Sequence, residues 1–164
     1  MNGRLLVINA LVAALYFVVT AVVAPFGFLH IQFRLSEMFN HLIVFDRRYF
    51  FGIVTGVIIA NLVFSPTKAD LIFGVGHTVI SLLITIVIGY FIVNKTALML
   101  INSVVFSFNM FIIAYMLKVF VGLPEGFGFL WLTLGVSELL TMIIAIFIVY
   151  FIHKRIQFDT LLKA

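Results

Sequence analysis

The sequence predicts an all-α integral membrane protein: a single domain, residues 1–164, built as a bundle of membrane-spanning helices. Of its 164 residues, 65% are apolar and 10% are charged, and the mean hydropathy is +1.31. Soluble domains carry about 45–50% apolar and about 25% charged residues. The apolar residues also form long runs bounded by charges, without the strict alternation of barrel strands. These observations exclude a soluble or disordered chain and favour helices in a lipid bilayer.

The basic residues mark the borders of the membrane. The net charge is +4, but the ten Lys and Arg residues are spread thinly along the chain. Proteins that bind nucleic acid cluster such residues on one face, whereas membrane proteins place them where apolar runs end. We therefore expect no nucleic-acid partner. The chain has no cysteine, which excludes disulfides and thiolate metal sites and leaves the redox compartment undetermined.

Five apolar runs are long enough to span a bilayer, which takes about 20 residues. In chain order they lie between Arg4 and Pro25, Arg48 and Pro66, Asp70 and Asn94, Ala97 and Lys118, and Phe129 and Ile152. The first run has about 19 residues, longer than the hydrophobic region of a signal peptide. We expect it to remain in the protein.

The segment 34–46 has an apolar helical face but is too short to span unaided. It is either a short tilted helix or an interfacial one. The positive-inside rule leaves this choice open, because either topology divides the ten basic residues seven to three.

Glu138 is the only charged residue well inside one of the five runs. It lies about nine residues into the last run, roughly 13 Å below its border. Because an ionisable side chain inside a membrane is costly, it marks a functional site by default. We expect a ligand-binding carboxylate, and the alternative is a structural carboxylate bonded to a neighbouring helix.

Counting depths with both termini inside brings other polar residues near Glu138. The expected outward-facing pocket, closed by the loop 25–33, is lined by Gln32, Arg34, Glu37 and Asp70 at the rim, Asn61 and His77 near the outer ends of their helices, and Asn109 at the depth of Glu138. Four of these residues, Asn61, Asn109, His77 and Asp70, also have a structural interpretation. Asparagines often hydrogen-bond between membrane helices, His77 suits an interface, and Asp70 stands where a helix N-cap belongs.

Small residues at helical spacing indicate close packing. We expect Gly52 and Gly56 to pack inside the bundle, whereas Ala10 and Ala14 suit either internal packing or a partner protein. No metal-ligand spacing, phosphate-binding loop or catalytic motif is present in the sequence. We expect no enzyme, no cofactor, no metal and no ATP hydrolysis by this chain.

The run IQFRLSE at 31–37 resembles the signature of the QueT family, the substrate-binding S components of energy-coupling-factor (ECF) transporters assigned to queuosine precursors. The resemblance continues at Ala14-Leu15-Tyr16, from Gly52 to Ala60-Asn61, at Asp70-x-x-Phe73-Gly74, at Asn102 and at Gly135-x-x-Glu138. The chain departs from the family pattern at His41, in the stretch 46–51 and at Ser137, departures that affect the pocket rather than the assignment.

The resemblance implies six transmembrane helices, the second short, with both termini on the cytoplasmic side of a bacterial cell membrane. Such S components capture a nutrient outside and dock on a membrane T component that carries two cytoplasmic ATPase subunits. They are thought to topple within the bilayer. The resemblance makes Ala10 and Ala14 part of the docking surface.

The implied ligand is a 7-deazaguanine base. Glu138 would accept its adjacent N–H groups, Asn109 or Asn61 would contact its carbonyl and ring nitrogens, and phenylalanines or Trp131 would stack on its ring. Glu37 would pair with an aminomethyl ammonium. The alternatives are an S component for another vitamin, a proton-coupled carrier using Glu138, and a scaffold without a ligand. The sequence lacks the inverted repeat that many carriers have.

Overall fold

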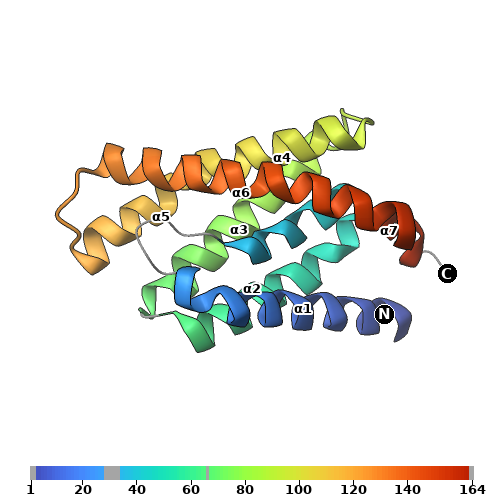
Figure 1. The fold of residues 1–164 in the computed structure, drawn as a ribbon, viewed down its shortest axis with the longest axis horizontal. Helices are drawn as coiled ribbons and strands as arrows, with labels where there is room; N and C mark the ends of the chain where they lie inside the picture. The colour runs from blue at the N-terminus through green and yellow to red at the C-terminus, as the bar shows by residue number, and fades with distance from the viewer. Residues whose placement is uncertain (1–2, 28–33, 66, 163–164) are drawn as a thin grey trace.

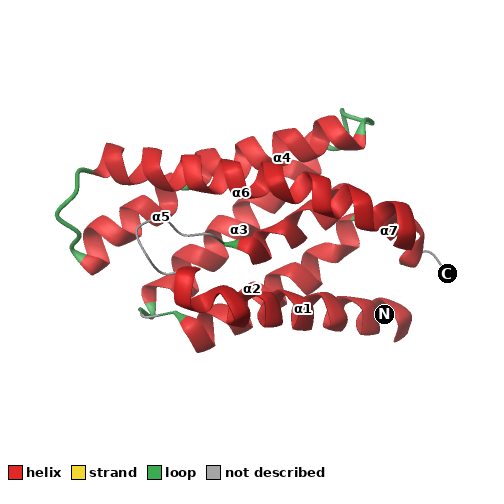
Figure 2. Cartoon of the chain, in the orientation of Figure 1, coloured by secondary structure: helices red, strands yellow, loops and turns green. Residues whose placement is uncertain are grey.

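The computed structural model describes residues 3–27, 34–65 and 67–162 and shows helices throughout, with no strand in these ranges (Figures 1 and 2). The long helices are α1 (Gly3–Gly27), α2 (Phe50–Phe64), α3 (Ala69–Ile88), α4 (Lys95–Asn109) and α6 (Phe127–Ile156). The short elements are η1 (Leu35–Val44), η2 (Arg47–Tyr49), α5 (Phe111–Met116), the π-helical turn η3 (Leu117–Val121) and α7 (Phe158–Leu161). Within the described ranges, five stretches are long and apolar enough to cross a membrane. The predicted all-α membrane fold is confirmed.

Helices α1 and α2 are parallel neighbours in close contact. A Cβ added to Gly52 would lie 2.7 Å from the backbone oxygen of Asn9, and one added to Gly56 would lie 2.7 Å from Cβ of Tyr16 and 3.2 Å from Cα of Ala13. The contacts advance together along both helices, so the two run in the same direction. The side chain of Asn9 also accepts a hydrogen bond from the Gly52 N–H at 2.7 Å. The predicted internal packing of the glycine pair is confirmed.

Because α1 and α2 are parallel, the chain between them must return across the bundle, and η1 makes much of that return. Its ten residues extend roughly 20 Å at the rise of a 3₁₀ helix, less than the thickness of the hydrocarbon core. It contacts α1, α2, α3, α4 and α6, and most of its side chains are buried. It is therefore a short internal segment and not an interfacial helix. Both chain ends lie at the same end of the bundle (Figure 1), as six passes require.

Two of the long runs are not continuous helix within their predicted bounds. The run ending at Asn94 is helical only to Ile88, and the side chain of Asn94 instead caps α4 by accepting the Ala97 N–H at 3.0 Å. The run from Ala97 to Lys118 is interrupted at Met110, where α4 gives way to α5. The sequence stays apolar across this break, so a hydropathy profile does not reveal it.

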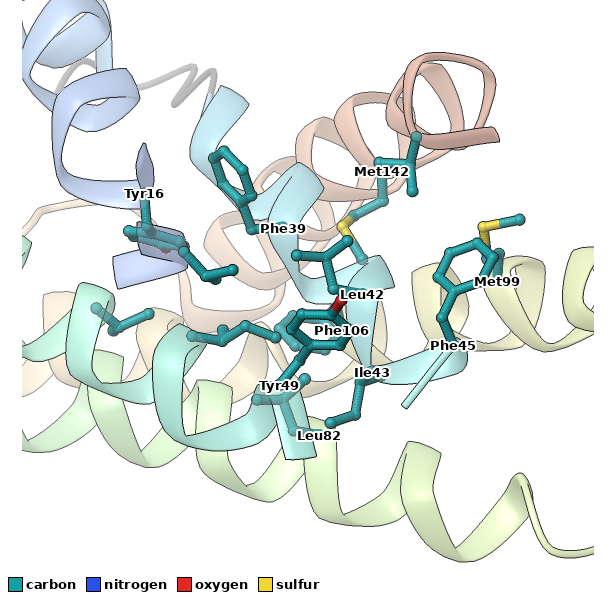
Figure 3. Packing of buried hydrophobic residues seen from close by; sticks show 14 of the residues in the cluster. Tyr16, Phe39, Leu42, Ile43, Phe45, Tyr49, Leu82, Met99, Phe106 and Met142 are labelled. Carbon is teal, nitrogen blue, oxygen red and sulfur yellow. The ribbon is translucent and has the colours of Figure 1, made fainter. Parts of the chain in front are cut away.

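The apolar core surrounds η1. Figure 3 shows its buried side chains packed among those of the long helices, with Phe39 near the Tyr16 ring, Leu42 and Ile43 near Tyr49, and Met142 on the far side of the segment. The centroids of the Tyr16 and Phe39 rings are 6.1 Å apart. The core thus fixes η1 from several sides, and with it the polar side chains that the segment carries.

Candidate ligand-binding site

Glu37 lies in the first turn of η1, inside the bundle. Only 3% of the residue is exposed. The Tyr16 hydroxyl of α1 donates to its Oε1 at 3.0 Å, and Nδ2 of Asn40, one 3₁₀ turn further along η1, donates to its Oε2. The expectation that Glu37 lies at the rim is therefore wrong. The carboxylate is held in the interior by donors from two elements.

Glu138 lies on α6 and interacts electrostatically with Glu37 and with Arg34, which directly precedes η1. It is 1% exposed, and its Oε1 has no hydrogen-bond partner among the described residues. Two buried carboxyl groups therefore lie within electrostatic reach of each other and of the partly buried Arg34. Burying charges is costly unless they are paired and hydrogen-bonded. The region around the two carboxyl groups is therefore suited to a ligand that supplies hydrogen-bond donors or positive charge.

His77 of α3 belongs to the same region, because the charge of Arg34 also acts on it. Its Nε2 lies 3.0 Å from the carbonyl oxygen of Phe106, which can only accept, so Nε2 carries the proton. Nδ1 is buried and without a partner in the described part of the chain. A second proton there would add an unpaired buried charge near Arg34, so Nδ1 is an acceptor.

A second polar layer holds η1 against the helices around it. The Asn102 side chain of α4 accepts from the Thr85 hydroxyl at 2.7 Å, and its Nδ2 lies 3.3 Å from both the Asn40 carbonyl and His41 Nδ1. Nε2 of His41 donates to the Met142 carbonyl of α6 at 3.0 Å. This network fixes the orientation of η1, and in it His41, a departure from the family pattern, has partners on both ring nitrogens.

The two other predicted asparagines have partners within the bundle. Nδ2 of Asn109 donates to the Ser81 hydroxyl at 2.9 Å. Nδ2 of Asn61 donates to the Asp70 carbonyl at 3.3 Å and packs against Gly74. Asp70 lies in the first turn of α3 and is not the N-cap residue of that helix. Its carboxylate accepts hydrogen bonds from the hydroxyl groups of Ser65 and Thr67. Asn61 and Asp70 thus join the ends of α2 and α3.

Trp131 lies two helical turns from Glu138 on α6. It packs in an aromatic group with Phe108, Phe111 and Phe127, and its indole N–H donates to the Phe108 carbonyl at 2.9 Å. Gln32 and residues 28–33 of the expected closing loop lie outside the described residues.

The structure therefore brings four predicted residues together: Arg34, Glu37, His77 and Glu138. Asn40 and Tyr16 were not predicted to be part of the site. The three-residue spacing of Asn40 from Glu37 is a sequence feature that could have indicated their contact. The role of Tyr16 depends on the packing of α1 against η1, which the sequence does not show.

Ala10 and Ala14 are exposed on α1. Ala10 also borders a groove of about 270 Å³ on the α1–α2 surface, whose other lining residues are Leu5, Leu6, Asn9, Ala13, Phe51, Gly52 and Thr55.

We predict that Tyr16→Phe destabilises the protein. The variant removes one of the donors to the buried Glu37 carboxylate, and a hydrogen bond to a charged group contributes about 1.5–3 kcal/mol. Thermal unfolding in detergent should therefore occur at a lower temperature. Tyr115→Phe is the matched control, because Tyr115 is 50% exposed on the outside of the bundle. Equal unfolding temperatures for both variants would contradict the role given to Tyr16.

Most of the chain is similar in sequence to known membrane transporters. The sequence profile of the QueT transporter family matches residues 6–154. The Queuosine precursor transporter QueT of Lactococcus lactis subsp. cremoris (strain MG1363) is 32% identical over 159 residues, covering 90% of this chain and 91% of the relative. No solved structure matches the chain significantly. The family and the relative are transporters, which confirms the prediction that this multi-pass membrane protein is not an enzyme. The chain belongs to the QueT transporter family.

Proposed function

We propose that the chain is the substrate-binding S component of an ECF transporter. It captures a queuosine precursor, a 7-deazaguanine base, at the outer face of a bacterial cell membrane. A membrane T component and two cytoplasmic ATPase subunits complete the importer. Membership of the QueT family and the name of the Lactococcus relative support the substrate. The sequence has no phosphate-binding loop, which is consistent with ATP hydrolysis by partner subunits.

The observation that carries the proposal is the buried Glu138 carboxyl with an unpartnered Oε1 beside Arg34 and Glu37. A guanine-type base presents adjacent N–H donors on one edge, and a carboxylate accepts such a pair with strong, charge-assisted hydrogen bonds. Both oxygens of Glu37 already accept from Tyr16 and Asn40. Glu138 is therefore the carboxyl group that contacts the base, and Glu37 lies close enough to attract an aminomethyl ammonium by charge.

The proposed orientation places both termini in the cytoplasm. It puts seven basic residues inside and three outside, as the positive-inside rule favours. Arg34 and the first turn of η1 then lie toward the outer face, so the site is loaded from outside. The face of α1 around Ala10 and Ala14 is exposed and borders the groove between α1 and α2, and we propose it as the docking surface for the T component.

The proposal is tested by calorimetric titration of the purified protein in detergent with 7-deazaguanines. Calorimetry is preferred because the indole of Trp131 is packed among phenylalanines and need not report binding. We expect saturable, submicromolar binding that thiamine, riboflavin and biotin do not compete with. Binding of one of these vitamins instead would discard the substrate. A folded protein that binds none of the compounds would discard the proposal.

The transport class is tested in liposomes that contain the protein with its T component and ATPases. Uptake should require ATP and persist when an uncoupler abolishes the proton gradient. Uptake that collapses with the uncoupler while ATP is maintained would instead identify a proton-coupled carrier using Glu138.

A further inference from the structure

We infer that Asn40, His77 and Glu138 form a hydrogen-bond-accepting surface that selects free bases carrying a 2-amino group and an unsubstituted N9–H. We call these three side chains the acceptor triad. The inference rests on the proposed function and specifies which related bases the site binds weakly.

The amide of Asn40 has a defined orientation. The Glu37 carboxylate accepts a hydrogen bond from it, so Nδ2 faces Glu37 and Oδ1 faces away. The backbone carbonyl of Asn40 is held by Asn102. Asn40 is fully buried, and its Oδ1 has no partner within the ranges that the structure describes. A buried acceptor that is left unpaired is costly, so Oδ1 is placed to meet a donor from a ligand.

The other two members have the same character. His77 is fully buried with its proton committed to the Phe106 carbonyl, which leaves Nδ1 as an acceptor. Glu138 is 1% exposed and presents Oε1. The triad comes from three elements, η1, α3 and α6, and η1 packs against both of the others. Three buried groups of one hydrogen-bonding sign in one region indicate a complementary ligand rich in donors.

A guanine-type free base has this complement. Along one side of the ring it carries N1–H, the two hydrogens of the 2-amino group and, beyond N3, N9–H. Replacing the 2-amino group by an oxygen puts an acceptor opposite an acceptor. Placing a methyl group or a ribose on N9 removes a donor and adds bulk. Sites built to hydrogen-bond a substrate group reject analogues that lack it far more strongly than apolar pockets reject a methylene.

The test is a ligand series on the unmodified protein, measured by calorimetry. The compounds are 7-deazaguanine, 7-deazahypoxanthine, 7-deazaxanthine and 9-methyl-7-deazaguanine. We expect 7-deazaxanthine to bind at least about 100-fold more weakly than 7-deazaguanine, and the other two at least about tenfold more weakly. Equal affinity across the series would overturn this inference and leave the proposed function intact. Binding of none of the four would overturn both.

A thermodynamic cycle that combines the variant Asn40→Leu with the ligand analogues tests the role of Asn40. Asn40→Leu should weaken binding of 7-deazaguanine about tenfold more than it weakens binding of at least one of the analogues that lack a donor, because that analogue no longer uses Oδ1. A purely structural role would lower the affinity for all ligands by the same factor and overturn the assignment. Thr133→Val is the control, since its hydroxyl donates within α6 to Phe129 and lies outside the triad. The ligand series remains decisive if Asn40→Leu does not fold.

Discussion

Replacing Glu138 by glutamine is expected to lower the affinity for 7-deazaguanine by about 100-fold. Glutamine has the same shape, but it exchanges one accepting oxygen for an NH₂ donor that would face an N–H group of the base. The loss of one charge-assisted hydrogen bond and the exposure of a buried donor to another donor together cost about 3 kcal/mol, and each 1.4 kcal/mol is a factor of ten in affinity. Calorimetric titration of both proteins measures the ratio.

Stability separates a binding role for Glu138 from a structural one. A neutral amide is less costly to bury than a carboxylate, so the ligand-free Glu138→Gln protein should unfold at the same temperature as the unmodified protein or higher. Glu125→Gln is the matched control, because Glu125 lies in the connection before α6 and outside the proposed site. Unchanged affinity in Glu138→Gln, or equal loss in both variants, would move the site elsewhere.

Gly52→Val is expected to have the largest effect on stability. The added Cβ would lie 2.7 Å from the backbone oxygen of Asn9, and a backbone atom cannot move aside as a side chain can. Helix α1 must therefore shift, which also breaks the hydrogen bond between Asn9 and the Gly52 N–H. Overpacking typically costs about 1–3 kcal/mol, and an unpaired buried N–H a further 1–3 kcal/mol or so.

Thermal unfolding in detergent, together with the yield of folded protein, measures this loss. Gly76→Val on α3 is the matched control, because a Cβ at Gly76 meets no atom within 4 Å and valine is the better helix former. If the two variants unfold at the same temperature, the close approach of α1 and α2 at Gly52 does not contribute to stability as we argue.

The long spans could be predicted because charges bracket them, and hydropathy alone locates apolar runs. Hydropathy does not locate helix ends inside such a run. Asn94 is polar and bounds the run that begins at Asp70, although its side chain caps the following helix. The break at Met110 lies between apolar neighbours and leaves no trace in composition. These boundaries depend on local hydrogen bonds that a hydropathy pattern does not contain.

The part of the site that could be predicted is the part where one residue has an evident energetic cost in the membrane. Glu138 stands out because a carboxyl group inside an apolar run is costly, and Arg34 and Glu37 belong to the run that resembles the family signature. Which way a side chain points is a tertiary property. The indole N–H of Trp131 is taken by the Phe108 carbonyl, and the amide of Asn40 is set by Glu37. Phe108 lies on a different span from Trp131, and the three-residue spacing of Asn40 from Glu37 permits the contact without showing which amide atom makes it.

The internal position of η1 has a consequence for biogenesis. The five stretches that are long and apolar enough to cross a membrane can enter the bilayer as independent units. A segment with Arg34, Glu37 and His41 cannot, since a charged residue at the centre of a helix opposes insertion by about 2.5–3.5 kcal/mol. η1 can take its buried position only after α4 and α6 supply its hydrogen-bond partners, Asn102 and the Met142 carbonyl. We therefore expect the chain to complete its folding after it leaves the translocon. Substitutions that disrupt η1 would leave a protein that is inserted in the membrane with the correct topology but whose core is not packed.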